Sequence, residues 1–353
     1  MRGRICSGVH GALRRCCRPA AGWLFAFLCL PACGGGGETI VAIAPHPVDP
    51  DIVYVVTHNG VLKTRDGGTS WQRVFTGATQ SRVQAIGLDP SAPSTIYVGT
   101  KDDGVYKSYD GGQHWMSRRA GLDDVRVTAE VQQFLFGPGT QPRVFLATAM
   151  GVFESDDGGE VWRKRMAGIT GVLMVTTMAM DPVSPEILYA GTSSGVYKTT
   201  DEARSLVAVN RGLIPAERVQ SSRSLGITAL AVNPQQTETL YAGTLDGLYK
   251  TVDGGRSWSR IGKNLPDQFV SAITFDHARP DVLYIGGGSG VFASRDGGVT
   301  WELRDRGLES HNVLALVASR AKPGLLFAGT NGSGLYRSRD DAAMWEHVTL
   351  GIR

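Results

Sequence analysis

The sequence predicts an all-β fold built from one repeated unit, and three observations predict it. Glycine accounts for 46 of 353 residues, roughly twice its usual share of about 7%, and shows no collagen period, which indicates many tight turns. A segment ending in Asp-Gly-Gly-x-x-Trp recurs with its aspartates 44, 47, 44, 52, 43 and 44 residues apart. Six of the seven tryptophans close this segment. The seven repeated aspartates are Asp66, Asp110, Asp157, Asp201, Asp253, Asp296 and Asp340.

Each repeat predicts four strands, which the second copy shows clearly. Residues 83–89 alternate small and large apolar side chains, as an inner strand near a central axis requires. After a proline-containing turn come a second strand (95–100), a third strand (104–108) and a fourth that begins at Trp115 and ends at Gly121-Leu122. Four strands in about 44 residues, seven times over, predict a seven-bladed β-propeller of four-stranded antiparallel blades.

The ends of the repeat region predict how the ring closes. The first inner strand is expected over residues 39–44, and the last outer strand over residues 345–349. Because the chain starts on an inner strand and ends on an outer one, the first and last blades are expected to meet by packing alone, without a shared sheet.

The N-terminal segment differs from the repeats. Residues 1–32 carry five arginines and no acidic residue, and the eleven-residue apolar run 20–30 is too short to span a bilayer but suits a secretory signal. Leu30-Pro31-Ala32-Cys33 resembles the lipobox of bacterial lipoproteins, which implies lipid attachment at Cys33. The alternative is an ordinary cleaved signal with an accidental cysteine.

These features predict three parts of the chain: a lipoprotein-type signal peptide (1–32), a glycine-rich tether (33–38) and the propeller (39–353). We expect an exported protein, anchored by its lipid to the bacterial cell envelope on the periplasmic or outer surface. Without the lipid it would be secreted.

Composition excludes several classes of function for the propeller. All five cysteines lie within residues 1–33, so the propeller can hold no disulfide, cysteine zinc site or cysteine nucleophile. Without the five leader arginines the formal charge falls from +3 to −2, which argues against a nucleic-acid partner. No metal-ligand spacing or phosphate-binding loop occurs, so we expect no metal and no cofactor. We expect a monomeric propeller that meets the membrane only through its lipid anchor.

The repeated turn resembles a known signature. Residues 64–71 (Thr-Arg-Asp-Gly-Gly-Thr-Ser-Trp) and 294–301 are similar to the Asp-box, or BNR repeat, of sortilin-like, xyloglucanase-like and photosystem II assembly factor-like propellers. The resemblance implies that the box lies between the third and fourth strands, on the face away from the ligand site. We therefore interpret the seven aspartates as structural. The fourth and seventh copies depart from the signature, with Ala203 and Ala342 in place of a glycine.

Binding residues are expected where loops break the repeat. Lys101, Asp102 and Asp103 insert charge between the second and third strands of the second blade. The long connection 123–130, which ends at Glu130, belongs to the same face, and another long connection covers residues 214–226. Arginines at the ends of fourth strands are expected to lie beside the channel mouth; the ligand-binding candidates among them are Arg119 and Arg165.

Two functions follow as hypotheses. The first is a non-catalytic binding or assembly platform for a protein or glycan at the cell envelope, with no catalytic residue. The alternative is a carbohydrate-active enzyme of the glycoside hydrolase kind, using two carboxylates at the channel mouth. Candidate carboxylates are Asp103, Glu130, Asp246 and Glu309. The xyloglucanases that the sequence resembles pair two propellers around a cleft, whereas this chain supplies one.

Overall fold

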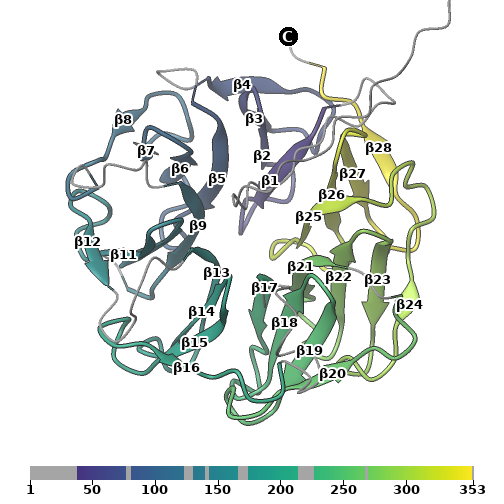
Figure 1. Ribbon diagram of the computed structural model, residues 1–353. Coiled ribbons are helices and arrows are strands. Elements are labelled where there is room, and N and C mark those ends of the chain that lie inside the picture. Colours follow the sequence, from purple (N-terminus) through teal and green to yellow (C-terminus); the bar gives the residue numbers. More distant parts are fainter. Residues whose placement is uncertain are drawn as a thin grey trace, which may run out of the picture. The chain divides into compact units, whose positions relative to one another are not determined.

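The computed structural model describes residues 38–76, 81–122, 130–139, 143–165, 174–213, 226–266 and 269–351. These residues form seven four-stranded antiparallel sheets within one compact unit, Gly35–Arg353. The sheets stand around a central axis as the blades of a propeller (Figure 1). The predicted seven-bladed, all-β fold is confirmed.

In every blade the strand order follows the chain from the axis outward. The innermost strands are β1 (Ile40–Pro45), β5 (Val83–Leu88), β9 (Val131–Phe136), β13 (Val175–Met180), β17 (Ile227–Val232), β21 (Val270–Phe275) and β25 (Val313–Ala318). The second strands are β2 (Val53–Thr57), β6 (Ile96–Thr100), β10 (Val144–Thr148), β14 (Leu188–Thr192), β18 (Leu240–Thr244), β22 (Leu283–Gly287) and β26 (Leu326–Thr330).

The outer half of each blade is shorter and more polar. The third strands are β3 (Gly60–Thr64), β7 (Val105–Ser108), β11 (Gly151–Ser155), β15 (Gly195–Thr199), β19 (Gly247–Thr251), β23 (Gly290–Ser294) and β27 (Leu335–Ser338). The outermost strands are β4 (Gln72–Phe75), β8 (Met116–Ser117), β12 (Arg163–Arg165), β16 (Val207–Ala208), β20 (Ser259–Ile261), β24 (Glu302–Leu303) and β28 (Glu346–Val348).

The core lies between the blades. One apolar cluster fills each interface between neighbouring sheets, so the second strands, covered on both faces, are buried throughout their length. Between the second and third blades this cluster includes Tyr97, Phe134 and Trp162. A Cβ atom on Gly99 would lie 2.5 Å from the Val131 side chain, so only glycine lets β6 approach the next blade this closely.

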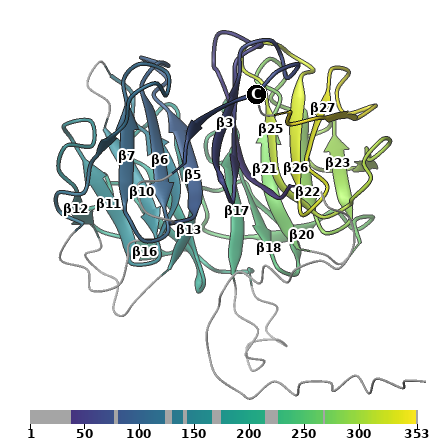
Figure 2. The same cartoon turned by 90° about the horizontal axis from the view of Figure 1, so that it is seen from above.

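The two faces of the ring carry different loops (Figure 2). The Asp-box turns pack on the turns between first and second strands, as where Gly111 N–H donates to Ser94 O at 2.9 Å. We call this side the Asp-box face. The opposite side, the loop face, carries the loops between second and third strands and the connections between blades. There Lys101 N–H donates to Arg82 O at 2.9 Å.

A pair of donors ties each of several blades to the next. Tyr97 on β6 and Lys107 on β7 both donate to the carbonyl of Gly158 in the following Asp-box, at 2.8 and 2.6 Å. The ammonium group also lies over the tyrosine ring, 5.0 Å from its centroid. The same Tyr–Lys pair recurs as Tyr54 with Lys63, Tyr189 with Lys198, and Tyr241 with Lys250.

The ring closes between β1 and β25–β28 without a shared sheet, as predicted. An apolar cluster that includes Ile40 and Phe327 fills this interface. Packing does not act alone, because Gly334 N–H donates to Glu38 O at 3.0 Å and the Arg337 guanidinium donates to Gly67 O. That part of the sequence expectation is wrong, because the Tyr–Lys position of the last blade holds an arginine that reaches the first Asp-box.

Candidate binding face

The Asp-boxes are turn structures. In the fifth blade, Asp253 accepts hydrogen bonds from the Ser257 hydroxyl at 2.6 Å, the Thr251 hydroxyl at 2.6 Å and the Ser257 N–H at 2.9 Å. These donors lower the pKa of Asp253 to about 2. Each of the other six aspartates likewise accepts N–H bonds from its own turn: Asp66, Asp110, Asp157, Asp201, Asp296 and Asp340.

Four of the Asp-box tryptophans donate their indole N–H to the preceding blade: Trp115, Trp162, Trp258 and Trp345. The Trp162 indole N–H donates to Arg118 O at 3.0 Å, and the Trp162 backbone N–H donates to Ala120 O at 2.8 Å. A Cβ atom on Gly121 would lie 1.9 Å from the Trp162 carbonyl oxygen, which explains the glycine that follows the fourth strand. The Asp-box face is therefore occupied by contacts that hold blades together.

The loop face of the second blade brings the predicted charged residues over the start of β5. Asp102 N–H donates to the Ser81 hydroxyl at 2.9 Å, beside the Lys101 contact with Arg82. Asp103 N–H donates to the Thr100 hydroxyl at 2.9 Å. The Lys101 and Asp102 side chains are exposed, and Asp103 is half-buried. The Lys101 and Asp102 charges are thus presented to solvent by a loop whose backbone is held by hydrogen bonds.

Glu130 lies on the other side of the same segment. Its Oε1 atom accepts a hydrogen bond of 2.5 Å from Gln84 Nε2, on β5, and its carbonyl accepts the Ala149 N–H at 3.1 Å. The Gln84 Oε1 atom is buried and accepts no hydrogen bond from the described residues. The structure therefore places Lys101, Asp102 and Glu130 around the first residues of β5. The connection 123–129 lies outside the described residues, as do residues 214–225.

Sequence reasoning missed the residues at the centre of this arrangement, Ser81, Arg82 and Gln84. Arg82 also lies near His58, in the β2–β3 loop: burial first, and then the Arg82 charge, lower the pKa of His58. A signal was present for Gln84, because the inner strand Val-Gln-Ala-Ile interrupts its apolar pattern with an amide. A shift of register between Val83 and Ala85 takes Gln84 out of the regular pairing with β6.

The two arginines predicted at the channel mouth lie elsewhere. Arg165 is part of β12 and Arg119 follows β8, and these are the outermost strands of their blades (Figure 1). The expectation is wrong because each fourth strand is the farthest from the axis. Arg165 Nε lies 2.7 Å from the buried carboxylate of Glu154. Arg119 lies on the loop face beside Gly104, because a Cβ atom built on Gly104 would be 3.5 Å from the Arg119 Cγ atom.

The four carboxylates considered for hydrolysis are spread around the ring. Asp103 and Glu130 belong to the second and third blades, Asp246 to the β18–β19 loop of the fifth, and Glu309 follows the sixth. Within the described ranges, no three His, Cys, Asp or Glu residues are grouped to hold a metal ion. In the same ranges, no helix is both long and apolar enough to cross a membrane. Cys33 lies outside the described residues.

The fold and the location of its loops define a seven-bladed Asp-box propeller. No family model matches the sequence. A probable oligoxyloglucan-reducing end-specific xyloglucanase from Neosartorya fischeri is 29% identical over 235 residues, which cover 64% of this chain and 24% of that protein. The corresponding enzyme of Emericella nidulans is 30% identical over 238 residues, 63% of this chain and 27% of that protein. The chain thus spans about a quarter of the length of these curated relatives.

Solved structures share the fold. A GH74 enzyme from Niastella koreensis superposes with a TM-score of 0.72 at 18% identity, over 90% of this chain and 55% of that one. YCF48 bound to a D1 peptide gives a TM-score of 0.64 at 16% identity, over 87% of this chain and 94% of that one. The chain is therefore a seven-bladed propeller related in sequence to xyloglucanases, and its fold is also that of YCF48.

Proposed function

We propose that the chain is a non-catalytic binding or assembly platform that recognises a protein segment or a glycan through the loop face of its second and third blades. One observation carries this proposal. Lys101, Asp102 and Glu130 lie around the start of β5 on the loop face, opposite the Asp-box face. Exposed charges of both signs on a fixed backbone suit a polar ligand, because little ordering is needed when it binds.

The comparisons support both kinds of ligand. Xyloglucanases act on a glycan, and YCF48 has been seen with a D1 peptide. The match to YCF48 covers nearly all of that chain, which favours a single propeller as a sufficient binding unit. A glycoside hydrolase activity is the second candidate, favoured by the sequence similarity to xyloglucanases. It needs two carboxylates roughly 5–9.5 Å apart across the scissile bond.

The two candidates separate in one experiment with the purified full chain. Xyloglucan oligosaccharides and aryl glycosides are incubated with the protein, and release of reducing ends or aglycone is measured alongside binding by calorimetry. Binding of a glycan or of a pulled-down protein without product release supports the platform. If the unmodified chain releases product and Glu130→Gln or Asp103→Asn abolishes that release, the hydrolase is supported and the non-catalytic platform is overturned.

We also propose that the chain is exported and lipid-anchored at Cys33, on the strength of the Leu-Pro-Ala-Cys segment after the apolar run 20–30. Cys33→Ala should move the protein from the membrane fraction to the soluble fraction of a bacterial host. Mass spectrometry of the wild-type mature terminus provides the direct check. An unacylated terminus, or a terminus elsewhere than Cys33, contradicts the anchor.

A further inference from the structure

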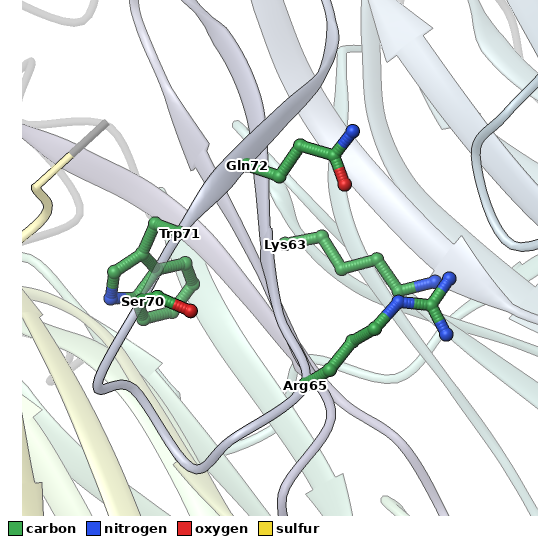
Figure 3. A pocket seen from close by; sticks show the side chains of 5 residues that line it. All are labelled: Lys63, Arg65, Ser70, Trp71 and Gln72. Atoms are coloured by element: carbon green, nitrogen blue, oxygen red, sulfur yellow. The ribbon is translucent and has the colours of Figure 1, made fainter. Parts of the chain in front are cut away.

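A hollow of about 340 Å³ borders the Asp-box of the first blade, away from the loop face (Figure 3). Two basic side chains, two polar ones and a tryptophan line it: Lys63, Arg65, Ser70, Gln72 and Trp71. The Lys63 and Arg65 side chains extend in the same direction, while the Trp71 ring lies on the other side of the turn (Figure 3). Two cations thus line one hollow, and the Arg65 charge acts on Lys63.

Lys63 is a confined cation. Its side chain is almost fully buried, its Nζ atom donates to Gly111 O at 2.8 Å, and it lies 4.9 Å from the centroid of the Tyr54 ring. An ammonium group has three donors, so this contact leaves others for a ligand. Burial, and then the Arg65 charge, lower the pKa of Lys63 to about 8, with Asp110 acting in the opposite direction. Burial and the Arg65 charge therefore disfavour the charged form of Lys63.

The nearest carboxylates are already engaged. Asp110 accepts the N–H groups of Gln113 and His114 at 2.8 and 2.9 Å, within its own turn. Asp66 accepts the Ser70 hydroxyl at 2.5 Å and the Ser70 N–H at 2.9 Å. Arg65 is exposed and makes no hydrogen bond or ion pair with another described residue. No carboxylate of the described turns therefore bridges the two cations.

The lysines of the second, fourth and fifth blades pair with the neutral residues Met116, Val207 and Ser259, whereas the seventh blade pairs its cation with a carboxylate. In the seventh blade Arg337 occupies the place of Lys63, and Glu346, on the neighbouring strand, lies 3.0 Å from it. Gln72 occupies the place of Glu346 in the first blade. In the second blade, Tyr109 replaces Arg65 and its ring lies 4.4 Å from the Lys107 ammonium group. Among the described repeats, only the first has a cation at both the Lys63 and Arg65 positions and a neutral residue at the Gln72 position.

We propose that this hollow binds a tetrahedral oxyanion, sulfate or phosphate, between Lys63 and Arg65, with Gln72 as a further donor. Such an anion accepts several hydrogen bonds at once and supplies the negative charge that Glu346 supplies in the seventh blade. The site lies on the Asp-box face and is separate from the binding proposed for the loop face.

The test uses the full chain with inorganic phosphate and inorganic sulfate as separate probes, each compared with sodium chloride at the same ionic strength. We expect a saturable rise in the melting temperature with at least one oxyanion, because a ligand that binds only the native state stabilises it. Arg65→Gln should weaken the apparent affinity by about tenfold or more, the worth of a charge-assisted contact. Since Arg65 is exposed, this variant should fold normally.

Two further variants make the result specific. Gln72→Glu copies the seventh blade and should abolish oxyanion binding while keeping the melting temperature in chloride. Arg295→Gln changes the matched arginine of the sixth blade, where Ala293 replaces the lysine, and should leave binding unchanged. A rise that depends on ionic strength only, or a saturable rise that Arg65→Gln and Gln72→Glu leave intact, overturns the proposal.

Discussion

Arg279 of the sixth blade lies 2.5 Å from the carboxylate of Asp341 in the Asp-box of the seventh. Asp341 stands where other boxes have a glycine whose carbonyl accepts the Tyr–Lys pair, and Ala293 stands where the lysine would be. The fourth box shows the same exchange: Glu202 replaces the glycine, Glu154 replaces the lysine, and the Arg143 guanidinium pairs with Glu202. An arginine from the turn before the second strand thus takes over the link between blades.

This exchange has a conformational cost. Glu202 and Asp341 have φ angles of 62° and 61°, and the alanines that follow them have φ of 63°. Side-chain-bearing residues adopt this left-handed region at a cost of about 1 kcal/mol or more each. The arginine contacts offset part of this cost, so the divergent turns keep the geometry of the intact boxes.

Arg279→Leu should lower the free energy of unfolding by about 1–2 kcal/mol, because Asp341 and the buried Asp276 both lose the arginine that pairs with them. Adding Ala293→Lys and Asp341→Gly to this variant should recover most of the loss, since the pair with Tyr284 would then resemble that of the fifth blade. Urea denaturation of the three proteins measures both effects. A triple variant no more stable than Arg279→Leu contradicts the interpretation.

One side chain of the last blade adds a polar link to the apolar packing that closes the ring. Arg337→Leu removes the hydrogen bond to Gly67 and the ion pair with Glu346, and should cost about 1–3 kcal/mol. Arg337→Lys should restore most of the stability, since lysine fills this role in four other blades. Arg339→Leu, at an exposed position, is the control. Equal shifts of the melting temperature in Arg337→Leu and Arg339→Leu would argue against a role of Arg337 in closing the ring.

The Asp-boxes predict a specific acid sensitivity. The pKa values of Asp201, Asp253 and Asp296 are each lowered to about 2, below the ordinary value of 3.8. A lowered pKa stabilises the native state above the unfolded value, and this stability is lost as pH falls from about 4 toward 2. The melting temperature should therefore fall steeply in that window.

Asp253→Asn provides the control for this pH dependence. With one titrating group removed, unfolding near pH 3 should take up fewer protons, and the melting temperature should depend less on pH there. Calorimetric scans between pH 2 and pH 5 measure the slope. A slope identical to that of the unmodified chain would mean that the Asp-boxes do not determine acid stability.

The sequence predicted the fold because one unit recurs with its turns and tryptophans in register. It also predicted that Lys101, Asp102 and Glu130 share a face, since antiparallel order places those loops together. It did not predict the position of Arg165, whose partner Glu154 is identified only once β11 and β12 are paired. Nor did it predict the Arg279–Asp341 link, because these residues are 62 positions apart.

The most direct measurement of the central claim, that the loop face binds the ligand, uses a variant with Lys101→Ala, Asp102→Asn, Asp103→Asn and Glu130→Gln together. Lys101 and Asp102 are exposed, and the amides at positions 103 and 130 keep the shape and an acceptor oxygen of the half-buried carboxylates. The melting temperature of this variant should therefore stay within a few degrees of that of the unmodified chain. The control is Asp156→Asn with Arg163→Gln, an exposed ion pair between the Asp-box turn and the outer strand of the third blade. The ligand is the partner or glycan recovered with the unmodified chain. Its affinity should fall by about tenfold or more in the fourfold variant and stay unchanged in the control. Equal affinity in all three proteins would contradict the account.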